Sequence, residues 1–213
     1  MKTDDLVALL ATGTAAVEPN AAARRYATAL AFGAIGAMAM MAAVLGVRPD
    51  LNSAVLLPMF WAKFAFVASL AVTSGFVALR LCRPGTRLAA TPGVLAAPVI
   101  AMWMLAAFAL IAADPVQRHV LVFGGTWKTC PWFIALFALP VFVAVIWAMQ
   151  GLAPTRLRLA GAAAGFLSGS VGALVYTLHC PEMAAPFLGT WYLLGILIPT
   201  GAGALLGPRL LRW

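Results

Sequence analysis

Six long apolar segments joined by short polar connections constrain this chain more than any other feature. Each is close to the roughly 20 residues that an α-helix needs to cross the hydrocarbon core of a bilayer. The backbone amides of such a segment find no water there, so they must be satisfied within a helix. The pattern predicts membrane-spanning helices at about 26–47, 54–80, 92–113, 131–150, 157–178 and 187–208.

The composition agrees with this interpretation. The chain is 64% hydrophobic and only 9% charged, whereas a soluble domain carries about 25% charged residues. The sequence therefore predicts an all-α, polytopic membrane protein, with a polar N-terminal segment at 1–23 and a six-transmembrane-helix bundle at 24–213. Membrane lipid is then the expected surrounding of most of the chain. The net charge of +8 does not by itself indicate a nucleic-acid partner, and we expect none.

The basic residues are distributed unevenly between the two ends of the predicted helices. One side holds ten of the fourteen Lys and Arg residues, and the other holds Arg48, Arg118 and Lys128, while Lys63 lies inside the second segment. Cytoplasmic loops carry the excess of Lys and Arg in membrane proteins. We therefore expect both termini in the cytoplasm of a bacterial cell, with the chain passing several times through the inner membrane.

Two of the three cysteines, Cys130 and Cys180, stand just before prolines at the ends of predicted helices. The charge distribution places both on the outer face, which is an oxidising compartment where disulfides persist. One interpretation is a static disulfide, or two small buried apolar side chains. The other is a thiol pair that senses oxidants or soft metals. Cys82 falls on the cytoplasmic side, has no obvious partner cysteine, and is predicted to be a helix-end residue without a functional role.

A metal site at the outer face is a further interpretation of the same cysteines. Thiolate and imidazole ligands suit zinc and copper, and the neighbouring candidate side chains include a carboxylate. The spacing matches no metal motif, so no cofactor is assigned beyond a transient metal ion. The candidate ligands are Cys130, Cys180, His179, His119 and Glu182.

Lys63 is the one basic residue well inside a predicted helix. A charge there is costly unless it faces the protein interior or reaches the interface. We expect its side chain to extend to the interface beside Trp61, with an ion pair to Asp50 or Asp114 as the alternative.

Small residues mark one face of the fifth predicted helix. Gly161, Gly165 and Gly169 recur four residues apart, with Gly172 close by. Such a face lets two helix backbones approach closely in a membrane. The pattern predicts packing inside one chain in preference to a dimer contact.

No catalytic set is present in the sequence, so an enzyme is not expected. There is no paired acid and base within the predicted helices, and the Cys-x-x-Cys motif of thiol oxidoreductases is absent. A membrane thiol or quinone redox protein that uses Cys130 and Cys180 as electron carriers is the alternative function. A small transporter is disfavoured because inverted repeats and charges at the bilayer midplane are missing.

The N-terminal segment contains a short amphipathic pattern. Thr3 is suited to cap a helix, and Asp4 and Asp5 are suited to its first turn. Leu6, Leu9 and Leu10 then share one face at helical spacing. This pattern predicts a helix that either rests on lipid or docks its leucines on a partner protein.

The order of several short motifs along the whole chain resembles the NrsF family, the negative regulators of sigma F. These motifs are Met1-Lys2-Thr3-Asp4-Asp5-Leu6, Arg48-Pro49-Asp50-Leu51, Phe60-Trp61-Ala62-Lys63, Arg83-Pro84-Gly85, Cys130-Pro131, His179-Cys180-Pro181-Glu182 and Trp191-Tyr192. The resemblance implies a six-helix inner-membrane anti-sigma factor that controls an extracytoplasmic-function sigma factor.

The resemblance also implies roles for individual residues. It makes Cys130 and Cys180 the outer-face pair required for the response to metal or oxidative stress. Only about 23 residues precede the first predicted helix, so we expect the sigma factor to bind the N-terminal helix through Leu6, Leu9 and Leu10. Arg83 and Arg87 are expected to add charge complementarity, which tunes the rate of encounter.

Overall fold

The computed structural model describes residues 3–12, 21–82, 91–152 and 154–212. Within these residues, six helical segments are long and apolar enough to cross a membrane, which confirms the predicted all-α, six-span fold. They are α2 (Ala21–Val44), α4 (Pro58–Leu81), α5 (Thr91–Ala112), α7 (Cys130–Gln150), α8 (Leu157–Tyr176), and the continuous segment formed by α9 (Ala185–Phe187), the π-helix η1 (Leu188–Tyr192) and α10 (Leu193–Leu210).

The shorter elements differ from the sequence prediction. A single turn, α3 (Leu51–Ala54), precedes α4, which begins at Pro58 and not near residue 54. Proline fits the first turn of a helix but cannot continue a preceding one. The connection between the third and fourth spans contains a short helix, α6 (Pro115–Phe123). The predicted N-terminal helix is α1 (Thr3–Ala11).

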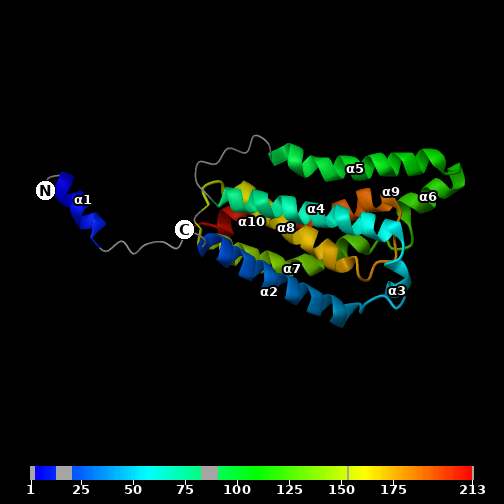
Figure 1. Ribbon diagram of the computed structural model, residues 1–213, viewed down its shortest axis with the longest axis horizontal. Helices are drawn as coiled ribbons and strands as arrows, with labels where there is room; N and C mark the ends of the chain where they lie inside the picture. Colours follow the sequence, from blue (N-terminus) through cyan, green and yellow to red (C-terminus); the bar gives the residue numbers. More distant parts are fainter. Residues whose placement is uncertain (1–2, 13–20, 83–90, 153, 213) are drawn as a thin grey trace.

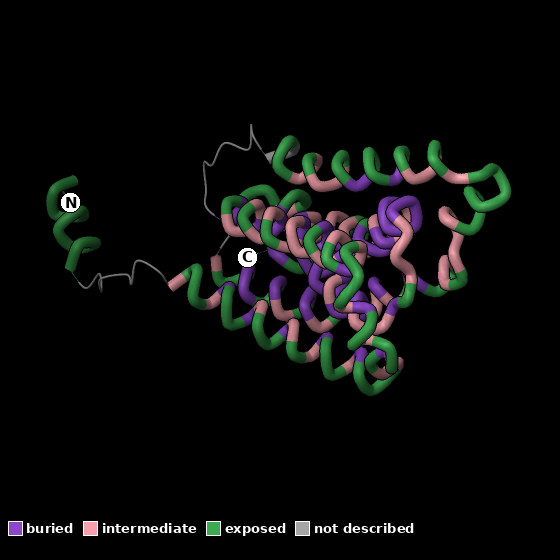
Figure 2. The backbone as a smooth tube through the Cα atoms, turned by 45° about the vertical axis from the view of Figure 1, so that its right-hand side comes forward, coloured by how far each residue is buried: buried purple, intermediate pink, exposed green. Residues whose placement is uncertain are grey.

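Helix α8 occupies the centre of the bundle. Helices α2, α4, α7 and α10 all pack against it, while α5 lies outside and contacts α4, α9 and η1 (Figure 1). Buried residues therefore concentrate on α7, α8 and η1, and one whole side of α5 is exposed (Figure 2). The exposed faces carry large apolar side chains, as expected for surfaces that meet lipid chains.

The glycine face of α8 accounts for this central position. A Cβ atom added at Gly161 or Gly165 would collide with the backbone of Gly203 or Pro199 in α10, and one added at Gly172 would collide with α7. These glycines thus let α10 and α7 approach α8 on two sides, which gains van der Waals contact where the hydrophobic effect does not drive helix association. The structure confirms the prediction of close packing within one chain.

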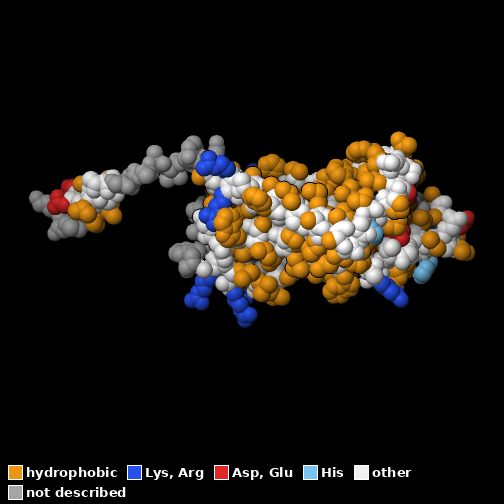
Figure 3. All heavy atoms as spheres, turned by 90° about the horizontal axis from the view of Figure 1, so that it is seen from below, with side chains coloured by type: hydrophobic (Ala, Val, Ile, Leu, Met, Phe, Trp, Pro, Cys, Tyr) orange, Lys and Arg blue, Asp and Glu red, His pale blue; other side chains and the backbone are white. Residues whose placement is uncertain are grey.

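The bundle has two chemically different ends. We call the end that holds Cys130 and Cys180 the thiol end. The opposite end is called the basic end because it carries Arg24 and Arg25 at the start of α2, Arg80 at the end of α4, and further arginines at the start of α8 and the end of α10. Figure 3 shows most of the basic side chains of the bundle at one end and the histidine side chains at the other.

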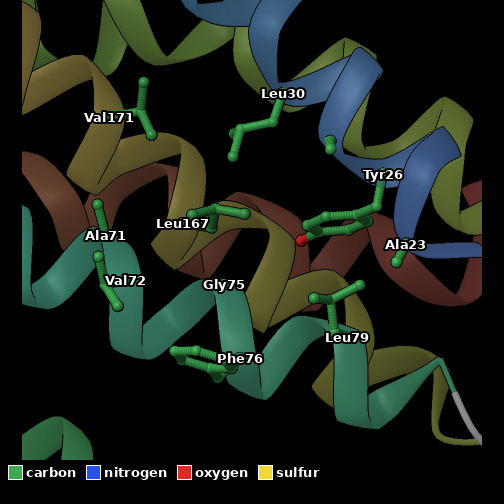
Figure 4. Close-up of a pocket in the computed structure, with 11 residues that line it drawn as sticks. Ala23, Tyr26, Leu30, Ala71, Val72, Gly75, Phe76, Leu79, Leu167 and Val171 are labelled. Atoms are coloured by element: carbon green, nitrogen blue, oxygen red, sulfur yellow. The ribbon is translucent and has the colours of Figure 1, made fainter. Parts of the chain in front are cut away.

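An apolar pocket of about 330 Å³ lies between α2 and α4, above α8. Tyr26, Leu30, Gly75, Phe76 and Leu167 are among the residues that line it (Figure 4). The Tyr26 hydroxyl is buried and has no hydrogen-bond partner in the described part of the chain. Helices α2 and α4 are therefore separated here, and α8 forms the floor between them.

The packing of α8 predicts a position-dependent response to one added methyl group. We expect Gly165→Ala to lower the unfolding free energy by about 1–3 kcal/mol or more, because the new Cβ meets the Pro199 carbonyl and backbone cannot yield as a side chain does. Gly201→Ala in α10 is the matched control, since nothing lies within 4 Å of its Cβ position. Thermal unfolding in one detergent compares them, and equal melting temperatures would contradict this packing.

Candidate functional site

Cys130 and Cys180 both lie at the thiol end, at helix ends whose positions had allowed a pairing without deciding it. Cys130 is the first residue of α7, and Cys180 lies in the non-helical segment between α8 and α9. Both thiols are free and fully buried. One more helix-like turn follows α8, in which the Cys180 amide donates to the Tyr176 carbonyl at 3.0 Å.

Lys63 points into this site, so the expectation that it extends to the interface was wrong. Its side chain is completely buried. Its Nζ donates to the carbonyl oxygens of Cys180 at 3.0 Å and Glu182 at 2.9 Å. It also lies 4.9 Å from the centre of the Tyr192 ring, a cation–π contact. The lysine on α4 therefore fixes the backbone of the cysteine segment.

The connection between α2 and α3 reinforces the same segment. The Arg48 side chain donates to the Cys180 carbonyl at 3.4 Å, and its amide donates to the Leu178 carbonyl at 3.2 Å. His179 Nδ1 lies 2.9 Å from the Gly46 carbonyl oxygen. Arg48 also pairs with Asp50 at 2.6 Å, and this hydrogen bond lowers the pKa of the exposed Asp50 carboxyl. Residues 178–180 are thus held from both α4 and the α2–α3 connection.

Glu182 ties the cysteine segment to the connection before α7. Its carboxylate accepts a hydrogen bond from the Gly125 amide at 2.7 Å. The neighbouring Gly124 has φ of 55°, and a Cβ atom there would collide with the same carboxylate. Glycine is needed at this position for its backbone conformation and for space. The carboxylate therefore faces Gly125 and not the thiol pair, although its own backbone carbonyl binds Lys63.

Aromatic rings close the site on two sides. The ring of Tyr176 lies 5.9 Å from that of Tyr192 and 6.1 Å from that of Phe133. Further out, the rings of Trp127 and Trp191 lie 5.1 Å apart, and Trp191 donates to the Val122 carbonyl at 2.8 Å. Trp191 and Tyr192 both belong to η1, so these contacts hold η1 against the rest of the thiol end. A π-helical turn often re-aims side chains at functional sites.

The thiol chemistry follows from these surroundings. The neighbouring Cys130 thiol lowers the pKa of the Cys180 thiol, against the opposing effect of burial, with smaller contributions from the Lys63 charge and the Tyr192 hydroxyl. A thiolate is the reactive form towards oxidants and soft metals. Cys82, at the other end of α4, is also buried, but burial raises its pKa to about 11. The two regions therefore differ sharply in expected thiol reactivity.

The five candidate metal ligands do not gather in one place. Cys130 and Cys180 are paired, but Glu182 binds Gly125, His179 faces the Gly46 carbonyl, and His119 stacks on Phe123 at 4.5 Å. The described part of the chain contains no cluster of three or more His, Cys, Asp and Glu side chains placed to hold a metal ion. The five candidates therefore do not form one preassembled set of ligands.

The predicted partner-binding residues lie away from the thiol pair, on α1. Thr3, Asp4, Asp5, Leu6, Leu9 and Leu10 are all exposed, and Figure 1 shows α1 apart from the bundle. Arg83 and Arg87, expected to assist binding, lie outside the described residues. The leucines of α1 are therefore available to a partner.

Sequence reasoning missed three residues of this site, namely Lys63, Tyr192 and Arg48. The usable signal was Lys63 itself, because a lysine within an apolar helix and without a nearby acidic residue in that helix needs polar partners elsewhere. Its partners are backbone carbonyls more than 110 residues away. No residue pattern marks such carbonyls as ligands.

Comparison with known proteins gives full-length matches. Residues 10–213 match the NrsF family, described as negative regulator of sigma F. The chain is 56% identical over 213 residues to a probable anti-sigma-F factor NrsF of Azospira oryzae, covering 100% of both chains. It is 37% identical over 215 residues to the anti-sigma-F factor NrsF of Caulobacter vibrioides, again covering 100% of both. No solved structure matches the chain.

The Glu182 contact predicts a local effect of one substitution. We expect Glu182→Ala to destabilise the 122–130 connection by about 1–2 kcal/mol, because it removes a charge-assisted hydrogen bond that is only partly buried. Hydrogen exchange of the Gly125 amide should accelerate accordingly. Asp114→Ala is the matched control, since the Asp114 carboxylate is exposed and makes no cap hydrogen bond to α6. Unchanged Gly125 exchange in Glu182→Ala would rule out this anchoring role.

Proposed function

Because the chain belongs to the NrsF family of negative regulators of sigma F, we propose that it retains a sigma factor at the membrane and releases it when the Cys130–Cys180 pair reacts. The family is regulatory and not enzymatic, so the chain is not an enzyme, and the alternative of a thiol–quinone redox protein is set aside. The observation that carries the sensory part is the convergence of two buried thiols beside a cation.

The charge distribution supports an orientation for this activity. The arginines at the basic end favour a cytoplasmic location under the positive-inside rule. The thiol end then faces the oxidising outer side of the bacterial inner membrane, where oxidants and soft metal cations reach it first. The start of α2 and the end of α10 both lie at the basic end in this arrangement. The partner is expected to be an extracytoplasmic-function sigma factor, held on the cytoplasmic side.

Helix α1 is the proposed sigma-factor ligand. Leu6, Leu9 and Leu10 are 42%, 67% and 67% exposed, and they lie on one face of a nine-residue helix. A short amphipathic helix can dock such a face into an apolar groove of a partner protein. The bundle itself offers short connections at the basic end, which makes α1 the best candidate for a specific protein contact.

Helix α7 provides a physical connection between the two ends. It begins at Cys130, and at its other end the Trp147 carbonyl accepts a hydrogen bond from Arg25 at 3.1 Å. The Arg25 guanidinium also lies 4.5 Å from the centre of the Trp147 ring. Arg25 stands near the start of α2, the helix that follows α1 in the chain. A displacement of α7 at the thiols would therefore reach the segment that carries α1.

The energy required for this response is modest. A difference of about 1.4 kcal/mol between the reduced and reacted forms changes the sigma-factor binding constant roughly tenfold. The stimulus must favour the releasing conformation, because a ligand that binds both conformations equally shifts neither. Closing a disulfide between Cys130 and Cys180 satisfies this condition by constraining α7 relative to the end of α8.

The docking proposal predicts a face-dependent loss of repression. We expect Leu9→Asp to release the sigma factor and raise transcription of its regulon, because a charge replaces an apolar anchor. Ala8→Asp, on the opposite face of α1, should leave repression close to normal. A reporter of the sigma factor compares the two, with protein abundance in the membrane as control. Full repression by the Leu9→Asp protein at normal abundance would refute docking through α1.

The sensor proposal predicts that loss of either thiol uncouples stress from transcription. Cys130→Ser and Cys180→Ser proteins should accumulate normally but hold the regulon in one state when cells meet an oxidant or a soft metal. Cys82→Ser is the matched control, because its thiol is buried at the opposite end and should not affect induction. Normal induction in the Cys130→Ser, Cys180→Ser double variant would overturn this role. Reduced abundance of both single variants would indicate a purely structural pair.

A further inference from the structure

The apolar pocket between α2 and α4 is a groove on the side of the bundle. Its floor is α8, where Leu167 and Val171 are buried. Its rim includes Ala27 of α2 together with Val72 and Phe76 of α4, which are all exposed. Exposed apolar side chains on these helices face the lipid in a six-span fold. The groove is therefore open towards the bilayer and closed towards the centre of the bundle.

The groove lies in the half of the bundle nearest the basic end. It extends from Ala23 to Leu30 near the start of α2, and from Ala71 to Leu79 near the end of α4. At a rise of 1.5 Å per residue, each wall is about 10–12 Å long. Among the described residues that line the groove, Tyr26 alone has a polar side chain. This long apolar shape suits a hydrocarbon chain that enters from one leaflet.

Tyr26 adds a polar requirement to the groove. Its side chain is 3% exposed, and Figure 4 shows its ring extending from α2 towards Leu167 of α8, with the hydroxyl at the tip. Within the described residues, this hydroxyl has no hydrogen-bond partner. A buried hydroxyl without an acceptor is costly, so an occupant that brings an acceptor is favoured over plain hydrocarbon. The ester carbonyl of a phospholipid is such an acceptor.

Both rims of the groove lead to an arginine at the basic end. Residues three or four apart share one face of a helix. Arg24 therefore lies one turn beyond Ala27 on α2, and Arg80 lies one turn beyond Phe76 on α4. Both arginines are exposed, and basic pockets between membrane helices bind the headgroups of anionic lipids. The charge at this end of the groove thus complements a negative headgroup.

We propose that the groove binds one chain of an anionic phospholipid. The acyl chain lies on Leu167, its ester carbonyl accepts a hydrogen bond from Tyr26, and the phosphate lies between Arg24 and Arg80. Along α2, the basic, hydroxyl and apolar side chains follow one another in the order of the phosphate, the ester and the hydrocarbon of the lipid. The bound chain fills the space between α2 and α4 and fixes their separation.

The test compares two lipids that differ only in the headgroup. Full-length protein in a nonionic detergent is titrated with phosphatidylglycerol or phosphatidylcholine of identical acyl chains, and native mass spectrometry gives the dissociation constant of the first bound lipid. Two arginines beside the phosphate should make phosphatidylglycerol bind roughly tenfold more tightly. The double variant Arg24→Gln, Arg80→Gln should lose this preference. The double variant Arg209→Gln, Arg212→Gln removes the same charge at the end of α10 and just after it, and should retain the preference.

Two further variants test the groove itself. Gly75→Leu places a side chain in the groove without a backbone clash, because a Cβ there meets only a Leu167 methyl group at 3.9 Å. It should weaken phosphatidylglycerol binding by roughly tenfold or more, since it displaces buried methylene groups. Gly201→Leu in α10 is the matched control, with nothing within 4 Å of its Cβ position. Tyr26→Phe should weaken binding severalfold without lowering the melting temperature of the lipid-free protein, because the hydroxyl it removes has no protein partner.

Equal affinity for the two lipids would overturn the proposal, because the groove would then hold hydrocarbon without recognising a headgroup. Unchanged phosphatidylglycerol binding in Gly75→Leu, or an intact headgroup preference in Arg24→Gln, Arg80→Gln, would also overturn it, because the lipid would then bind elsewhere. If Gly75→Leu does not fold, the arginine variants and Tyr26→Phe decide the question. None of these measurements involves the sigma factor or the thiols, so their outcome is independent of the proposed function.

Discussion

The hydrogen bonds from Lys63 to the Cys180 and Glu182 carbonyls fix the segment between α8 and α9, on which the thiol end depends. The chain after α8 leaves helical geometry and folds back into the bundle, so its carbonyl groups need donors that the helix no longer supplies. Lys63 supplies them from α4, and Arg48 adds a donor from the α2–α3 connection. Without these cations, Cys180 would have no fixed position beside Cys130.

The glycine face of α8 is the second requirement, because the proposed response needs helices that cross the bundle as tightly packed units. Gly165 and Gly172 bring α10 and α7 into backbone contact with α8. Interfaces packed this closely shift as units and do not deform continuously. Helix α7 carries Cys130 at one end and accepts the Arg25 hydrogen bond at the other, while α4 carries Lys63. In the proposed response, a reaction at the thiols acts on helices that cross the whole bundle.

The sequence predicted the parts of this structure that depend on periodicity and length. The six spans follow from hydropathy, and the packing face of α8 follows from the spacing of Gly161, Gly165 and Gly169. The pairing of Cys130 with Cys180 was allowed by their places at helix ends, but a disulfide, a metal site and free thiols remained open.

The position of the Lys63 side chain was predicted wrongly because its partners are main-chain carbonyls. Every residue has such a carbonyl, so no sequence pattern distinguishes them. Helix α6 was missed because its nine residues are too short for a clear periodic signal, and the π-helical turn that aims Tyr192 has no sequence signature.

The central claim is that the chemical state of the thiol pair sets the affinity for the sigma factor. The most direct test measures the dissociation constant of purified sigma factor for the full-length protein in lipid nanodiscs, in its dithiol form and after oxidation to the Cys130–Cys180 disulfide. We expect the disulfide form to bind the sigma factor at least about tenfold more weakly than the dithiol form. This difference corresponds to about 1.4 kcal/mol or more of binding free energy. Equal affinity for the two forms, with the disulfide verified by mass spectrometry, would contradict it.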